Sequence, residues 1–230
     1  NNALSEMISG ERNIGIGTFA LNQLVRGTRN IAIGADALYR TAYADRNVVI
    51  GKAAGTYMHT DPKEHKYNDN TVLGYAALTA KGKNYSENVA IGAQAMASNP
   101  NGENDVVRAT AVGTEAGYFC GDYDVSVGYR ANRYMKGGGN VCIGAYTGTS
   151  SHTGHSNIII GKQARIEPVG GTWQNPIEAN NTIVIGTDTV AKKSNQVVIG
   201  NVNHTEFIVL GNKKVNFNTD GTVTWEEITI

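Results

Sequence analysis

The sequence has little of what several common protein classes depend on. Its 230 residues include only 2 Cys and 4 Pro, and two Cys cannot make a disulfide framework. Neither charge sign is in excess, since Lys plus Arg and Asp plus Glu each number 20, whereas nucleic-acid-binding domains carry a basic surplus. No apolar run approaches the roughly 18 residues of a membrane-spanning helix. These shortages argue against a disulfide-rich, nucleic-acid-binding or membrane-inserted protein.

What the sequence has instead is glycine and asparagine. Gly occurs 28 times, and Asn is nearly as frequent. Both are poor helix formers, and both tolerate positive φ in tight turns. The composition therefore favours a turn-rich β fold over a helical bundle. The first residues, Asn1 to Leu4, contain no Met, basic cluster or apolar run, so we expect no signal peptide and interpret residues 1–12 as a connection to a missing upstream part.

A short unit repeats along nearly the whole chain. It consists of three mostly apolar residues and a Gly, often with Asn in front and Ala three places after. Its twelve copies end at Gly17, Gly34, Gly51, Gly74, Gly92, Gly113, Gly128, Gly144, Gly161, Gly186, Gly200 and Gly211. Spacings of about 14 to 17 residues recur, too short for helix-pair repeats or propeller blades. Such a length suits a coil of two short strands and two turns.

The three apolar residues of each copy read as a strand. Side chains alternate across a strand, so the residue before Gly and the residue two places earlier share one face. These residues are mostly β-branched, which favours a strand, and we expect their face, with Ile33 and Ile160, to be the core. The middle residue is also largely apolar, from Ala32 to Ile159. We therefore expect the opposite face to be covered too, by other copies of the chain.

The repeat predicts an all-β fold, a parallel β-solenoid of about twelve short coils over residues 13–211. Gly allows a tight corner without a Cβ, and Asn side chains of successive coils can form amide ladders. A small residue three places after Gly fits a narrow interior: Ala20, Ala37, Ala54, Ala77, Ala95, Ala116, Ala131 and Ala164. Residues 212–230 read as a β-hairpin with Val215, Phe217, Val223 and Trp225 on one face. We expect this hairpin to cap the last coil.

The unit Asn-x-x-Ile-Gly-x-x-Ala resembles the head repeats of trimeric autotransporter adhesins, which are left-handed parallel β-rolls. The same unit recurs in bacteriophage tail fibre proteins, and the run from Ser194 to Gly211 is most similar to the fibres. The resemblance covers about residues 13–211, and the long insertions depart from it. It implies a homotrimer with an adhesive, receptor-binding role.

The function that we expect from this resemblance is receptor binding by the distal part of a phage tail fibre. Its partners would be two further copies of the chain and a glycan or outer-membrane protein of a bacterial surface, and its location the virion. We expect no enzyme. Two alternatives stay open, a polysaccharide depolymerase and a bacterial trimeric autotransporter adhesin head.

Three insertions interrupt the repeat, at about residues 55–69, 97–109 and 166–181. Loops inserted into a solenoid project from one edge and often form its binding surface. Aromatic rings with a polar tip suit sugar rings, and the insertions and the stretch 117–124 supply them. The candidate receptor-binding residues are Tyr57, His59, Tyr67, Tyr118, Asp122, Tyr123 and Trp173. The alternative is that these aromatic side chains pack down their own loops.

The sequence contains no pattern that demands a metal, a cofactor or a catalytic residue. His152 and His155 lack Cys or carboxylate neighbours in sequence, which is a weak metal signal. The run from Gly15 to Ala20 matches a dinucleotide fingerprint, but the repeat explains it without a cofactor.

Glu115, Asp122 and Asp124 lie close in sequence, and a glycosidase needs two facing carboxylates. No spacing rule places any two of them opposite each other. Cys120 and Cys142 fall in neighbouring repeats and can lie near each other, with Cys142 as a small buried residue.

Overall fold

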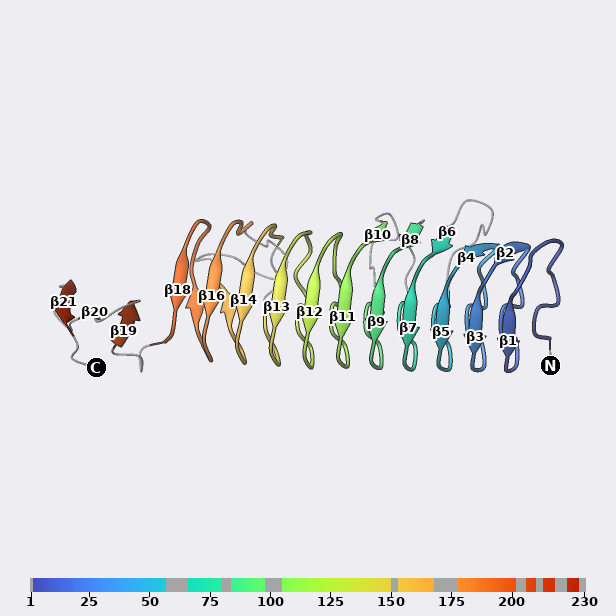
Figure 1. The fold of residues 1–230 in the computed structure, drawn as a ribbon, viewed down its shortest axis with the longest axis horizontal. Coiled ribbons are helices and arrows are strands. Elements are labelled where there is room, and N and C mark those ends of the chain that lie inside the picture. The colour runs from blue at the N-terminus through green and yellow to red at the C-terminus, as the bar shows by residue number, and fades with distance from the viewer. Residues whose placement is uncertain are drawn as a thin grey trace.

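The computed structural model describes residues 2–56, 66–79, 84–97, 105–149, 153–167, 178–201, 206–209, 213–217 and 223–227. The chain is an all-β parallel β-solenoid of about nine turns. Its strands follow one another along the longest axis of the molecule, starting from the N-terminal end (Figure 1). The described residues include no helix with the length and apolarity that crossing a membrane requires.

One long parallel sheet carries the repeat. Its eleven strands, in spatial order, are β1 (Ile14–Ile16), β3 (Ile31–Ile33), β5 (Val48–Ile50), β7 (Thr71–Leu73), β9 (Val89–Ile91), β11 (Thr110–Val112), β12 (Val125–Val127), β13 (Val141–Ile143), β14 (Ile158–Ile160), β16 (Ile183–Ile185) and β18 (Val197–Ile199). Equivalent residues of successive copies pair, as Ile31 does with Val48 and Ile158 with Ile183. The repeat thus stacks in register, as the sequence predicts.

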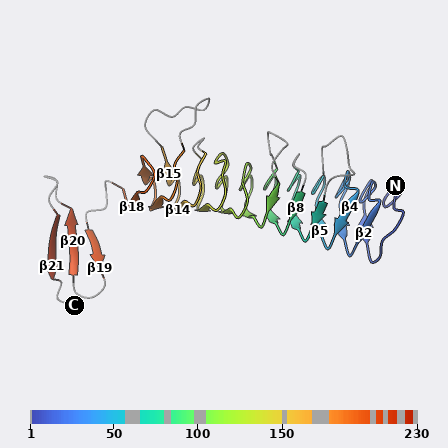
Figure 2. The same cartoon turned by 90° about the horizontal axis from the view of Figure 1, so that it is seen from above.

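Shorter sheets complete the coils. A second parallel sheet has five strands in the order β10 (Val106–Val107), β8 (Asn84–Ser86), β6 (Lys66–Asn68), β4 (Tyr43–Asp45) and β2 (Arg26–Thr28). Further along, β15 (Arg165–Ile166) pairs with β17 (Val190–Ala191). Figure 2 shows these coils from above, with the chain winding from the N-terminal end towards β18. The ends of the first two expected insertions, at β6 and β10, therefore belong to a sheet.

The assignment of the core face from the sequence is wrong. The middle residue of each strand in the long sheet is buried, except in the end strands β1 and β18, and the flanking residues are half-buried or exposed. Ala32 and Ile159 have no exposed surface, whereas Ile33 and Ile160 lie on the outer face. Alternation identifies which residues share a face, but not which face points inward.

The expected small interior residues are confirmed. All eight Ala residues three places after Gly are fully buried. Five of them, Ala37, Ala54, Ala77, Ala95 and Ala116, belong to one buried cluster with middle residues of the long sheet and with inward residues of the five-stranded sheet, such as Ala44, Tyr67 and Tyr85. The two sheets therefore share one narrow core.

The corner glycines have a steric reason. Gly34 has φ of +136°, and a Cβ there would lie 2.5 Å from the carbonyl oxygen of Gly51 in the next coil. Real Cβ atoms do not come that close, so no other residue fits without moving the backbone. This confirms the predicted role of the recurring Gly.

Buried Asn side chains form the expected ladder beside the long sheet. The Oδ1 atom of Asn30 accepts hydrogen bonds from the backbone N and Nδ2 of Asn47, and Asn47 binds Asn70 in the same way. Oδ1 of Asn70 in turn accepts hydrogen bonds from the backbone N and Nδ2 of Asn88. The ladder breaks at Ala109, and Asp124 then starts a second ladder, which continues through Asn140 and Asn157.

The C-terminal strands differ in part from the prediction. β20 (Lys213–Phe217) and β21 (Val223–Glu227) form the expected antiparallel pair, with Val215 opposite Trp225. β19 (Glu206–Val209), which holds Ile208 and Val209 of the twelfth copy of the repeat, pairs antiparallel with β20 and lies outside the solenoid stack. The estimate of about twelve coils is therefore too high. Within the described chain these three strands pair only with one another, so the expected capping of the last coil stays a prediction.

Candidate functional site

The structure describes only some of the candidate receptor-binding residues. Tyr57, His59 and Trp173 lie outside the described residues. Tyr67 lies in β6 with only 3 % of its surface exposed, and its ring centroid is 6.2 Å from that of Tyr85. Burial raises the pKa of the Tyr67 hydroxyl well above its usual value. Tyr67 is thus a core residue of the five-stranded sheet, as the packing alternative anticipates.

Tyr123 is exposed as expected, at 54 %. Its hydroxyl accepts a hydrogen bond from Nη1 of Arg108 at 2.9 Å, and the same guanidinium forms two bonds to Glu87. Oδ1 of Asp122 accepts a hydrogen bond from the backbone N of Val107, with an N···O distance of 3.0 Å. Asp122 therefore binds the neighbouring coil, while Tyr123 offers its ring to solvent.

Tyr118 belongs to a larger group that spans three coils. We call this group the tyrosine–arginine surface, and it consists of Tyr118, Phe119, Tyr129, Arg130, Arg133, Tyr134 and Tyr146. The Arg133 guanidinium lies over the Tyr118 and Tyr134 rings, at 5.5 and 4.7 Å from their centroids. Tyr129 and Tyr146 meet edge to face at 5.2 Å, and both are exposed. Rings fixed by cations in this way present flat apolar faces next to polar groups.

The three carboxylates of the depolymerase alternative have structural partners. Glu115 forms ion pairs with Arg130 and Arg133, at 3.0 and 2.6 Å. Asp122 accepts from the Val107 amide, and Asp124 has no exposed surface. This arrangement favours a structural role for each of them over a facing pair of catalytic acids.

Asp124 takes the place of an Asn in the buried ladder. Its Oδ1 accepts from the backbone N and Nδ2 of Asn140, at 2.8 and 3.2 Å. Its Oδ2 accepts from the backbone N of Gly121 and from Nδ2 of Asn132, at 2.8 and 3.0 Å. Burial raises the pKa of this carboxyl to about 7, although the four N–H donors act in the opposite direction. The group therefore titrates inside the fold near neutral pH.

The candidate metal-binding histidine and the two cysteines lie in different environments. His155 is exposed, and its Nδ1 accepts a hydrogen bond from the Gly138 amide at 3.0 Å, while His152 lies outside the described residues. Cys120 and Cys142 are free thiols, and burial raises the pKa of both. In the described part of the chain, no three His, Cys, Asp or Glu side chains are grouped as metal ligands.

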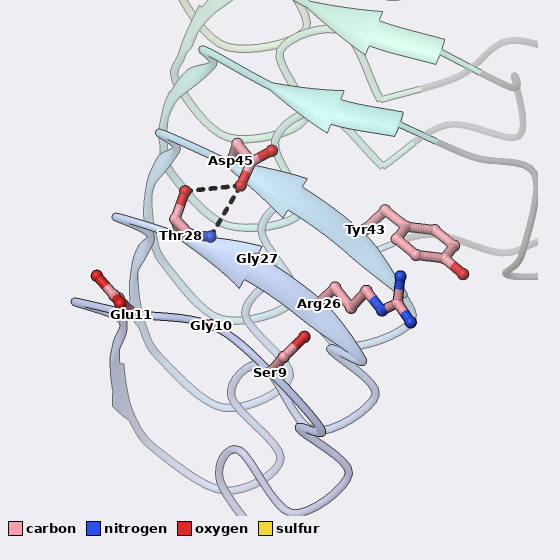
Figure 3. A pocket seen from close by; sticks show the side chains of 8 residues that line it. All are labelled: Ser9, Gly10, Glu11, Arg26, Gly27, Thr28, Tyr43 and Asp45. Atoms are coloured by element: carbon pink, nitrogen blue, oxygen red, sulfur yellow. Dashed lines mark hydrogen bonds between the residues drawn. The ribbon is translucent and has the colours of Figure 1, made fainter.

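A pocket of about 380 Å³ opens on the outer face of the five-stranded sheet, at its N-terminal end. Figure 3 shows the eight residues that line it: Ser9, Gly10, Glu11, Arg26, Gly27, Thr28, Tyr43 and Asp45. They come from three successive coils, because Ser9 bridges to Arg26 and β2 pairs with β4. The volume lies at the lower end of the range for small-molecule sites.

Hydrogen bonds within the pocket fix one of its acids. Oδ1 of Asp45 accepts from both the backbone N and Oγ1 of Thr28, each at 2.8 Å (Figure 3). Asp45 is half-buried, whereas Arg26 and Glu11 are exposed. The pocket therefore has one anchored carboxylate and two exposed side chains of opposite charge.

Sequence reasoning missed this pocket. It places recognition on the insertions, whereas these residues lie in strands and turns of the first coils. A signal is present in the triplets Arg26-Gly-Thr28 and Tyr43-Ala-Asp45, in which polar side chains alternate with a small residue. Such alternation is typical of a strand with one buried and one solvent-facing side.

Comparison with known proteins identifies no relative of this chain. No protein-family model, no curated protein and no solved structure matches it. The resemblance to adhesin heads and phage fibres is therefore carried by the repeat unit and the solenoid alone.

Proposed function

We propose that this chain is the receptor-binding portion of a phage tail fibre and acts as a homotrimer. In this role the virion carries it at the distal part of the fibre, where it adheres to a glycan or an outer-membrane protein of a bacterial surface. The solenoid is the rod, and side chains on its polar surfaces make the contacts with the receptor.

The observation that carries the proposal is the outer face of the long sheet, which we call the apolar face. It consists of the first and third residues of the eleven strands, and all of these are Ile, Val or Leu except Thr71 and Thr110. Eleven strands of three residues cover on the order of 500 Å², as large as the biggest apolar patches of typical monomers. Val48, Leu73, Ile158 and Val197 are among its exposed members.

Association of three copies through the apolar face would remove it from water and leave the polar side outside. The outer face of the five-stranded sheet is a separate surface that carries polar side chains such as Arg26, Thr28 and Asp45. In such an assembly each surface site is present three times on one rigid rod. Three linked sites raise avidity well above the affinity of a single site, which suits weak contacts with a surface glycan.

Sedimentation and adsorption to cells test the proposal. At micromolar concentration the protein should sediment with three times the chain mass of 24.5 kDa and should bind whole cells of a susceptible strain in a host panel. A soluble monomer would contradict the assembly. Shortening of capsule or lipopolysaccharide chains during incubation would point to the depolymerase instead.

A matched pair of tyrosines tests where the receptor is bound. Tyr123 and Tyr75 are almost equally exposed, at 54 and 56 %, but Tyr123 has its hydroxyl fixed by a hydrogen bond from Arg108. Tyr123→Ala should weaken adsorption, since a stacking ring contributes about 0.5 to 1.5 kcal/mol per site and three sites act together. Tyr75→Ala should leave adsorption unchanged. Equal effects would remove Tyr123 from the proposed receptor contacts.

A further inference from the structure

We propose that the pocket lined by Arg26, Tyr43 and Ser9 binds a sugar unit that carries a carboxylate, such as a uronic acid within an extended acidic glycan. The inference deepens the proposed function and rests on it, because it names the chemical class of the receptor. It places a binding site on the regular coils rather than on the insertions.

The pocket consists of two rows of outward side chains that cross three coils. Ser9, Arg26 and Tyr43 are neighbours across the strands and form the first row. Thr28 and Asp45 pair in the second row, on the side of the pocket where Glu11 also lies (Figure 3). The residues between the rows are Gly10, Gly27 and the buried Ala44, and the two glycines line the pocket with no side chain. A sugar ring can therefore approach the backbone between the rows.

The two rows differ in charge. Arg26 in the first row is exposed and has no ion-pair partner among the described residues. The second side holds two carboxylates, Glu11 and Asp45, of which Asp45 is anchored by Thr28. A guanidinium with five donors matches a carboxylate in a two-bond geometry. A ligand carboxylate is thus attracted to Arg26 and repelled from the opposite side, which defines one orientation.

The remaining groups suit the rest of a sugar ring. Carboxylates accept hydrogen bonds from hydroxyl groups, so Glu11 and Asp45 can bind ring hydroxyls at the edge away from the ligand's carboxylate. Tyr43 offers an apolar ring with a polar tip, and Ser9 both donates and accepts. A neutral sugar would leave the Arg26 charge unmatched, and a simple inorganic anion would not reach the second row.

The coil spacing extends the argument from one sugar to a chain. Neighbouring strands lie about 4.8 Å apart, close to the length of one sugar residue in an extended glycan. Arg26 and Tyr43 occupy equivalent positions in successive coils, so adjacent sugar units can contact adjacent coils. The pocket lies on the outer face of the five-stranded sheet, and none of its lining residues belongs to the apolar face, so the proposed trimer contact does not include it.

Two variants of equal charge and one pair of ligands test the site. The probe is an oligosaccharide of alternating glucuronic acid and N-acetylglucosamine, and its methyl ester, which lacks the charge, is the control ligand. The variants are Arg26→Gln and Arg29→Gln, and Arg29 is an exposed residue outside the pocket lining. Calorimetric or NMR titration measures the affinities, and circular dichroism checks that the fold is intact.

The wild-type protein should bind the free acid about tenfold more tightly than the ester, the effect of losing one charge-assisted contact. Arg26→Gln should weaken binding of the acid by a similar factor and leave the ester unchanged. Arg29→Gln should change neither by more than about twofold, as expected for a screened charge outside the site. Equal effects of the two variants, or equal affinity for acid and ester, would overturn the inference. If Arg26→Gln unfolds the protein, Tyr43→Ala replaces it, with an expected loss for both ligands.

Cell adsorption separates this inference from the proposed function. If wild-type protein adsorbs to cells but does not bind the acidic oligosaccharide, the proposed sugar site in the pocket is wrong and the proposed adhesive function still holds. Binding of the oligosaccharide without adsorption to any strain of a host panel would support the pocket and contradict the fibre function.

Discussion

Asn30 and Asn47 are joined by two hydrogen bonds that run along the axis of the solenoid. Oδ1 of Asn30 accepts from the backbone N of Asn47 at 3.1 Å and from its Nδ2 at 2.9 Å. Both side chains are fully buried. One amide oxygen thus satisfies a turn N–H and a side chain of the next coil, and links between coils stabilise a repeat protein.

Asn47→Ala should lower the free energy of unfolding by about 3 kcal/mol, because it removes hydrogen bonds to buried partners on both neighbouring coils. Asn70 would lose the acceptor of its backbone N and Nδ2. The matched control is Asn84→Ala, since Asn84 is half-buried and its Nδ2 binds Asp105 where water can replace it. Urea unfolding followed by circular dichroism measures both. Equal losses would contradict a special role for the ladder.

Neighbouring residues of β5 should respond in opposite ways to the same substitution. Val49 is fully buried, and Val49→Asp should prevent folding, because an unpaired carboxylate in a dry core costs several kcal/mol. Val48 is 38 % exposed, and Val48→Asp should leave the coil fold intact while it disrupts association through the apolar face. Circular dichroism and sedimentation separate the two outcomes. Retention of the trimer in the Val48 variant would place the interface elsewhere.

Stability should fall as the pH rises from about 4 to about 7, through the titration of Asp124. The pKa of this carboxyl is raised from 3.8 to about 7 in the fold, so the folded state holds a proton that the unfolded chain releases in this range. The contribution is complete below the unfolded pKa and is lost as the pH reaches the folded pKa. A shift of about 3 units corresponds to ~4 kcal/mol.

Asp124→Asn removes this titration and serves as the control. Thermal unfolding of both proteins between pH 4 and pH 8 should give a difference in stability that changes across this range and levels off above it. Parallel profiles of the two proteins would show that Asp124 does not titrate there.

Tyr67→Phe should leave the free energy of unfolding unchanged or raise it by about 1 kcal/mol. The Tyr67 hydroxyl is buried and has no hydrogen-bond partner among the described residues, and such an unsatisfied group costs free energy in the fold. Phe keeps the ring that packs near Tyr85. Tyr85→Phe, at the equivalent position of the next coil, is the comparison. A marked loss of stability in the Tyr67 variant would show that its hydroxyl has a partner.

The repeat is local information, and the sequence by itself determined the features that depend on it. The Gly at each corner, the Ala three places later and the Asn ladder follow from residues that occupy the same place in every coil, and the structure confirms them at Gly34, Ala37 and Asn47. A parallel, in-register stack is the arrangement in which identical turns and side chains meet their equivalents.

Only the tertiary structure decided which face of the strands points inward. Ile33 and Ala32 are both apolar, and side-chain alternation is symmetric between the two faces. The closure of the coil breaks that symmetry, because only one face of each strand can meet the other side chains of the core. The middle residues, from the small Ala32 to the large Ile159, lie on this inner face, and Ile33 turns outward to the apolar face.

The pocket likewise depends on how the coils close rather than on any motif. Successive members of the row Ser9, Arg26 and Tyr43 are 17 residues apart in sequence, and only the pairing of successive coils makes them neighbours.

The place of Asp124 in the Asn ladder, after the break that follows Asn88, likewise depends on the folded chain. Gly121, Asn132 and Asn140 supply N–H donors to the buried carboxyl group of Asp124 and partly offset the cost of its burial, and these donors converge only in the folded chain.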